Sequence, residues 1–131
     1  MKTLNLGVEI DQGADFSAII GIFGDGGLPI DITGYSFLGQ MRESTDPAAP
    51  VVAEFQFNIS NQDTNTGQVT WYLPEADIDE LITSVSGSLQ TSRLTTPYVF
   101  DVKMKDMGGV VTRIVQGLAY VSPQATQEIF P

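Results

Sequence analysis

The segment from Tyr98 to Pro123 has the pattern of a complete β-hairpin, and it constrains the fold more than any other part of the chain. Two runs with alternating apolar residues flank Gly108 and Gly109, a pair that permits the tight reversal between antiparallel strands. The second run is apolar on both faces, and no arrangement typical of a catalytic site lies along the segment. The pattern therefore predicts a scaffold with a contact surface.

Five further runs are predicted to be strands, most of them with the alternation of period two that indicates one buried face, and the adjacent Phe37 and Leu38 leave the register of the third run open. They cover residues 4–10, 16–23, 36–42, 53–59 and 69–73. Residues 16–23 carry apolar side chains on both faces, so this strand is expected to be buried on both sides, with a hairpin end at residues 24–27. Runs 53–59 and 69–73 are expected to pair as a meander, with Trp71 in the core and Tyr72 on the surface.

One short helix is predicted over about residues 75–85, because Pro74 precedes two acidic residues in the first turn and apolar residues follow at helical spacing. The strand spacing then predicts a mainly β fold, a single antiparallel, immunoglobulin-like β-sandwich of about seven strands. Residues 1–123 are expected to form this one domain, and residues 124–131 a C-terminal tail. The Ser- and Thr-rich segment from Ser86 to Pro97 has neither period and is expected to be an exposed loop.

Composition excludes several classes of function. The formal net charge of -10 repels nucleic-acid phosphates and anionic membrane surfaces. The chain has no cysteine and no histidine, so it has no thiolate metal site, no cysteine nucleophile and no imidazole base. The N-terminal residues lack the apolar run of a signal peptide, so we expect a soluble product of the cytoplasm.

No catalytic, cofactor-binding or metal-binding residue is predicted. Residues 63–67 resemble half of a calcium loop but lack the later bidentate acid, so a turn is favoured. Four aspartates beside glycine-containing turns are expected to be solvated turn residues rather than a cation site: Asp11, Asp15, Asp25 and Asp31. Asp101 and Glu54 lie at predicted outward positions, where acids serve solubility, so a glycosidase pair is not favoured.

The order of motifs resembles that of small structural proteins of tailed bacteriophages and prophages. The motifs are Gln12-Gly13-Ala14-Asp15-Phe16, the run from Gly24 to Tyr35, Met41-Arg42-Glu43-Ser44, Gly67-Gln68-Val69-Thr70, Leu73-Pro74, Tyr98 to Val102, Val111 to Gly117 and Val121-Ser122-Pro123. In this respect the chain resembles the N-terminal β-sandwich modules of phage baseplate upper proteins. Those modules attach receptor-binding proteins or fibres to the tail tip.

The resemblance implies a non-enzymatic structural protein of the virion, made in the host cytoplasm and built into the tail baseplate or fibre attachment region in several copies. Its expected partners are other phage structural proteins, with no cofactor, no nucleic acid and no membrane. A capsid decoration protein is one alternative. The other is a carbohydrate-binding module, which needs aromatic side chains such as Tyr35, Tyr72 and Tyr98 on one exposed platform.

The final strand supplies the predicted interface. Val115, Gly117, Ala119 and Val121 form one face, and Ile114, Leu118 and Tyr120 form the opposite one. A single sandwich normally leaves that second face polar, so its apolar residues are covered either by the helix or loop or by a neighbouring subunit. The complete set of expected contact residues is Ile114, Leu118, Tyr120, Tyr72, Arg93, Ile129 and Phe130.

Overall fold

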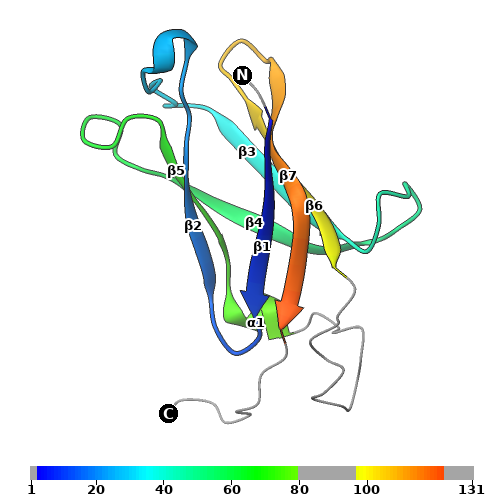
Figure 1. The fold of residues 1–131 in the computed structure, drawn as a ribbon. Coiled ribbons are helices and arrows are strands. Elements are labelled where there is room, and N and C mark those ends of the chain that lie inside the picture. The colour runs from blue at the N-terminus through cyan, green and yellow to red at the C-terminus, as the bar shows by residue number, and fades with distance from the viewer. Residues whose placement is uncertain (1–2, 80–96, 123–131) are drawn as a thin grey trace, which may run out of the picture.

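The computed structural model describes residues 3–79 and 97–122 (Figure 1). These residues form seven strands, one helix and one turn of 3-10 helix, in agreement with the predicted mainly β fold. In chain order they are β1 (Leu4–Asp11), β2 (Phe16–Gly21), η1 (Asp25–Gly27), β3 (Ser36–Arg42), β4 (Val51–Ile59), β5 (Gln68–Leu73), α1 (Glu75–Asp79), β6 (Tyr98–Lys105) and β7 (Val111–Ser122).

All seven strands belong to one sheet with the order β1-β7-β6-β3-β4-β5-β2, and this sheet curls until it is nearly closed like a barrel (Figure 1). The predicted sandwich of two sheets is therefore not confirmed. Five of the six strand pairs are antiparallel, whereas β1 pairs with β7 in parallel. The predicted meander of β4 and β5 is confirmed. The sheet thus joins the first described strand to the last.

The core lies inside the curl of the sheet and is centred on Trp71, which is 1% exposed, as the alternation of β5 predicts. Its ring centroid lies 5.1 Å from that of Phe16, 5.0 Å from Phe55 and 5.4 Å from Phe100. These four rings come from four different strands. Aromatic contacts at such separations add to the free energy gained by burial, so the cluster ties the two halves of the sheet together.

The predicted hairpin after Tyr98 is confirmed as the pair of strands β6 and β7. One carboxylate oxygen of Asp106 accepts hydrogen bonds from the backbone N–H groups of Gly108 and Val110, both at 2.9 Å. Gly109 has a φ of +87°, a conformation that suits glycine. The turn that joins the two strands is therefore held by a side chain as well as by the backbone.

The helix begins after Pro74, as predicted, and α1 covers Glu75–Asp79; the rest of the predicted helix, residues 80–85, lies outside the described residues. A carboxylate oxygen of Asp15 accepts a 2.7 Å hydrogen bond from the backbone N–H of Glu75. This bond satisfies one of the free N–H groups at the start of the helix. It also fixes the β1–β2 turn against α1.

Strand β2 differs from its prediction. We expected burial on both sides, but β2 is at the edge of the sheet and Ile19 on its outer side is 66% exposed. Phe23 is exposed as well. The expected hairpin end at residues 24–27 is confirmed only locally: the chain reverses there, with the backbone N–H of Gly24 bonded to the carbonyl of Leu28, but β2 pairs with β5 and not with β3. Only an isolated bridge between Phe23 and Pro29 closes the loop around η1.

The turn between β4 and β5 is organised by the amide of Gln62. Its Oε1 accepts hydrogen bonds from the backbone N–H of Ile32 at 3.0 Å and of Gly67 at 2.8 Å, and its Nε2 donates to the carbonyl oxygen of Ser60 at 2.8 Å. One side chain therefore replaces several backbone partners in a segment that has no sheet pairing. The bonds also join this turn to the chain before β3.

Replacing Gln62 by Met is expected to destabilise the protein by about 2–3 kcal/mol, because two partly buried N–H groups lose their acceptor while the side-chain volume changes little. Urea denaturation measures this difference. The matched control is Gln56→Met, at an exposed position of β4, for which we expect less than about 0.5 kcal/mol. Equal midpoints for the two variants would show that Gln62 does not hold the turn.

Candidate interaction surfaces

Two of the predicted interface residues lie on the outer side of β7. Leu118 is 39% exposed and Tyr120 is 44% exposed, although β7 has a paired strand on each side. Leu118 lies opposite Gly7 of β1 and Val99 of β6, so small or apolar residues surround it. The described residues leave this part of the outer face accessible and apolar.

Ile114 does not lie on that face, and its predicted position was wrong. It is 3% exposed and belongs to the core together with its neighbour Val115. The register between β6 and β7 shifts after Val102, so that Val102 pairs with Val115 and Lys103 with Arg113, which leaves Ile114 as an extra residue. Such a β-bulge interrupts the alternation of side chains. Both Ile114 and Val115 therefore point inward.

The other predicted contact residues fall into two groups. Tyr72 was expected on the surface but is half-buried on β5, beside the buried Trp71. Arg93, Ile129 and Phe130 lie outside the described residues, as do residues 86–96 of the predicted loop and the predicted tail. Their proposed roles remain predictions.

A row of polar side chains crosses five adjacent strands on the outer face. Backbone register aligns these residues from β1 to β4: Asn5, Gln116, Asp101, Gln40 and Glu54. The Nε2 of Gln116 donates to the Oδ1 of Asn5 at 2.8 Å, and the Nε2 of Gln40 donates to the Oε1 of Glu54 at 3.3 Å. We call this set the polar row.

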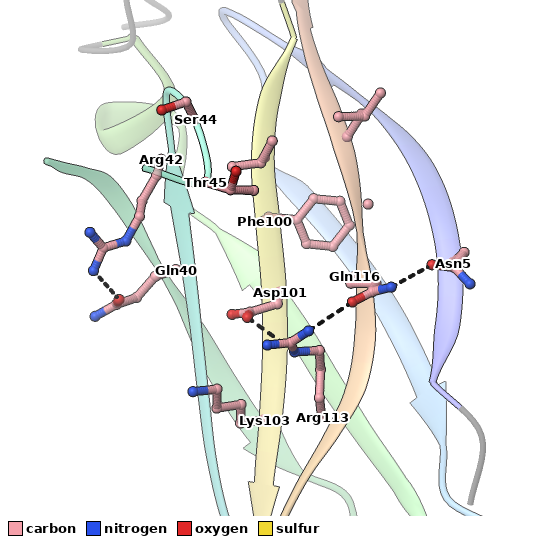
Figure 2. Close-up of a pocket in the computed structure, with 13 residues that line it drawn as sticks. Asn5, Gln40, Arg42, Ser44, Thr45, Phe100, Asp101, Lys103, Arg113 and Gln116 are labelled. Carbon is pink, nitrogen blue, oxygen red and sulfur yellow. Dashed lines mark hydrogen bonds and ion pairs between the residues drawn. The ribbon is translucent and has the colours of Figure 1, made fainter. Parts of the chain in front are cut away.

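Arg113 connects the polar row to a cluster of cations. Its Nε lies 3.4 Å from a carboxylate oxygen of Asp101, and its guanidinium donates to the Oε1 of Gln116 at 3.1 Å. Figure 2 shows Arg113 between these two acceptors, with Lys103 beside it and Arg42 reaching toward Gln40. These side chains line a shallow hollow of about 540 Å³, which Val99 and Leu118 also border.

The distribution of charge over the described residues is uneven. Their four basic side chains are Arg42, Lys103, Lys105 and Arg113, and all four lie on the outer side of the adjacent strands β3, β6 and β7. We call this set the cationic face. Only one ion pair forms within residues 3–79 and 97–122, between Arg113 and Asp101. Most of the positive charge on this face is therefore not neutralised by those residues.

The sheet is open between β1 and β2. Among the described strands, β1 and β2 each have one paired neighbour, and a groove between them is lined by Leu4, Ile20, Gly21, Ile22, Phe23, Ile114 and Val115. Strand β2 carries no charged residue. Unpaired edges of this kind are able to accept a further strand, and charges that usually prevent such pairing are missing from β2. The open edge is a second accessible surface.

Of the four aspartates that were expected to be solvated turn residues, Asp15 and Asp31 have hydrogen-bond partners. Asp15 holds the start of α1, and Asp31 accepts hydrogen bonds from the side chain and backbone of Thr33. The side-chain bond from Thr33, together with the backbone bond, lowers the pKa of Asp31 below its usual value. Within the described part of the chain, no three acidic side chains lie close enough to hold a metal ion. Residues 63–67 lie in the turn organised by Gln62.

Asp101 and Glu54 lie on the outer face, as predicted, with Gln40 of β3 between them in the polar row. Asp101 is paired with Arg113, and Glu54 accepts from Gln40. The aromatic platform needed for carbohydrate binding does not form as predicted, because Tyr98 is 6% exposed and belongs to the core. The outer face thus offers charge and hydrogen bonds rather than stacked rings.

The polar row and the cationic face were missed in the sequence. Arg113 and Gln116 are three residues apart, so strict alternation places them on opposite faces of a strand. The bulge at Ile114 brings them to the same face. A usable signal was present in the adjacent apolar pair Ile114-Val115, which fits a bulge better than an uninterrupted strand.

A scan against protein-family models found no match, and a search of the curated proteins found no significant match. The likeness to phage baseplate modules thus rests on the motifs quoted above. None of the helices in the described residues has the length and apolar character to cross a membrane.

Proposed function

We propose that this chain is a non-enzymatic structural protein of a tailed-phage virion, an adaptor that joins baseplate or fibre components through protein–protein contacts. The order of sequence motifs supports the assignment to phages. The structural observation that carries the adaptor role is the accessible apolar pair Leu118 and Tyr120 on a strand with neighbours on both sides. An accessible apolar patch on a folded domain is typical of a protein contact site.

The position of Leu118 and Tyr120 allows a partner to bind the domain after it has folded. Both residues point away from the core on a β7 that is already paired with β1 and β6. A partner can therefore cover them without any rearrangement of the sheet. Large side chains at the centre of an interface often contribute most of its binding free energy.

The double substitution Leu118→Asp with Tyr120→Asp is expected to leave the domain folded and to reduce its incorporation into phage particles at least about tenfold, because two contact residues become charged. Particles purified on a density gradient and quantified by mass spectrometry give this measurement. The melting temperature of the isolated protein shows whether the domain remains folded.

The matched control is Met107→Asp with Val110→Asp, which places the same charges on exposed apolar residues at the β6–β7 turn. This control is expected to assemble normally. If the Leu118 and Tyr120 variant folds and still enters particles, the adaptor contact lies on another surface. If it unfolds, the outer side of β7 is needed for folding and the proposed contact is wrong.

A further inference from the structure

The positive charge of the described residues is concentrated in a way that the stability of one molecule does not explain. Lys103 of β6 and Arg113 of β7 are direct cross-strand partners on the outer face. Like charges in such positions destabilise a sheet. Asp101 compensates Arg113, but no described acid forms an ion pair with Lys103, Lys105 or Arg42. The cationic face is therefore suited to an anionic partner.

The hollow on this face restricts the kind of anion that fits. It is shallow and extends over several strands, and Gln40, Gln116 and Asn5 supply amide groups beside the cations (Figure 2). Val99 and Leu118 add an apolar border. An acidic protein surface fits both the cations and the apolar border of the hollow, because its carboxylates pair with Arg and Lys while neighbouring side chains pack on the apolar border.

The same molecule carries an acidic surface at another position. Asp15, in the turn after β1, accepts a hydrogen bond from the backbone of Glu75 at the start of α1, and Asp11 and Asp77 lie within four residues of this contact along the chain. Figure 1 shows the end of β1 next to α1. We call Asp11, Asp15, Glu75 and Asp77 the acidic end. None of the four forms an ion pair with another described residue.

We propose that the acidic end of one copy of this chain binds the cationic face of a second copy. The inference rests on the proposed function, because it supplies the contact through which an adaptor forms a multi-copy assembly. Its basis is charge complementarity between the two surfaces, because three of the four cations on the cationic face and all four acids of the acidic end form no ion pair with a described residue. Lys103 and Arg113 are the central cations, and Asp11 and Glu75 are their exposed partners.

This contact joins two different surfaces, so it is heterologous. When each copy binds the next through this contact, the assembly grows in one direction. It becomes a closed ring if the rotation between neighbouring copies returns to the first copy, and an open filament if it does not. The net charge of -10 on each copy opposes association over long distances. At about 0.1 M salt, charges more than about 10 Å apart are largely screened, whereas ion pairs in contact are less affected.

Sedimentation velocity of the purified full chain at this salt concentration tests the proposal. The wild-type protein is expected to self-associate with increasing concentration. Lys103→Glu with Arg113→Glu, and separately Asp11→Lys with Glu75→Lys, are each expected to weaken association at least about tenfold. Circular dichroism spectra and melting curves confirm that each variant is folded.

Mixing the two variants is the decisive measurement. The acidic face of the first variant then meets the basic end of the second, and the unchanged surfaces also match, so association is expected to return in the mixture. A chain that carries all four substitutions is expected to self-associate as well. Asp63→Lys, an exposed change in the β4–β5 turn, is the control for altered net charge and is expected to have no effect.

A wild-type protein that remains monomeric at all accessible concentrations overturns the inference. So does association that neither charge reversal weakens, or that does not return on mixing. These results leave the adaptor function intact, because incorporation into particles is measured separately with the Leu118 and Tyr120 variant. If the Leu118 and Tyr120 variant is lost from particles while the charge-reversal variants are still incorporated, the partner of the outer face is a different protein.

Discussion

Gly117→Ala is expected to destabilise the protein by about 4 kcal/mol or more and to release β1 from the sheet. Gly117 of β7 lies opposite Leu6 of β1 in the parallel pair. A Cβ atom at this position would lie 1.6 Å from the backbone oxygen of Leu6, a distance that only a shift of the backbone relieves. Thermal unfolding measures the loss of stability, and amide hydrogen exchange shows whether the amides of β1 lose protection.

The matched control for this variant is Gly7→Ala on the neighbouring strand. A Cβ atom there meets only the ring of Tyr120, at 3.9 Å, which is an ordinary contact. We expect a change of less than about 1 kcal/mol, since alanine also restricts the unfolded chain. Similar stabilities for both variants would contradict the parallel pairing of β1 with β7.

Trp71→Ala is expected to cost about 3–5 kcal/mol, the range for removing a large aromatic side chain from a packed core. The indole contacts Phe16, Phe55 and Phe100 from three other strands, so its loss leaves a cavity that no single neighbour fills. Guanidinium denaturation followed by circular dichroism measures the change.

The adjacent residue provides the comparison. Tyr72→Ala removes another aromatic ring from β5, but on the half-buried side of the strand, and we expect a loss of about 1 kcal/mol. A loss for Tyr72→Ala as large as that for Trp71→Ala would mean that both faces of β5 are core. In that case Tyr72 would be excluded as a surface contact.

The local patterns of the sequence predicted the strands well. Strand β3 has the predicted bounds Ser36–Arg42, and the β6–β7 hairpin and the start of α1 are also confirmed. Alternation and turn residues act over a few neighbours, so they identify a strand without its partner. The parallel pairing of β1 with β7 depends on contacts more than a hundred residues apart, as between Asn5 and Gln116 with a separation of 111. No local pattern specifies it.

The predicted contact surface on β7 was partly correct, because the alternation rule holds only where the strand is regular. Alternation placed Leu118 and Tyr120 correctly because both follow the bulge in β7, where the period of two is regular. Ile114 lies in the bulge itself, so the same rule failed there. The cationic face needs the register of β3, β6 and β7 together, which only the folded sheet supplies.

The pairing of β1 with β7 also affects how a newly made chain folds. Closing a loop of 111 residues, the separation between Asn5 and Gln116, costs about 4 kcal/mol of chain entropy. During synthesis at about 5–20 residues per second, β1 leaves the ribosome about 5–20 s before its partner exists. During that interval β1 has no strand to pair with, because β7 has not yet been made. The nascent protein must therefore keep β1 from pairing with other chains until the last strand is made.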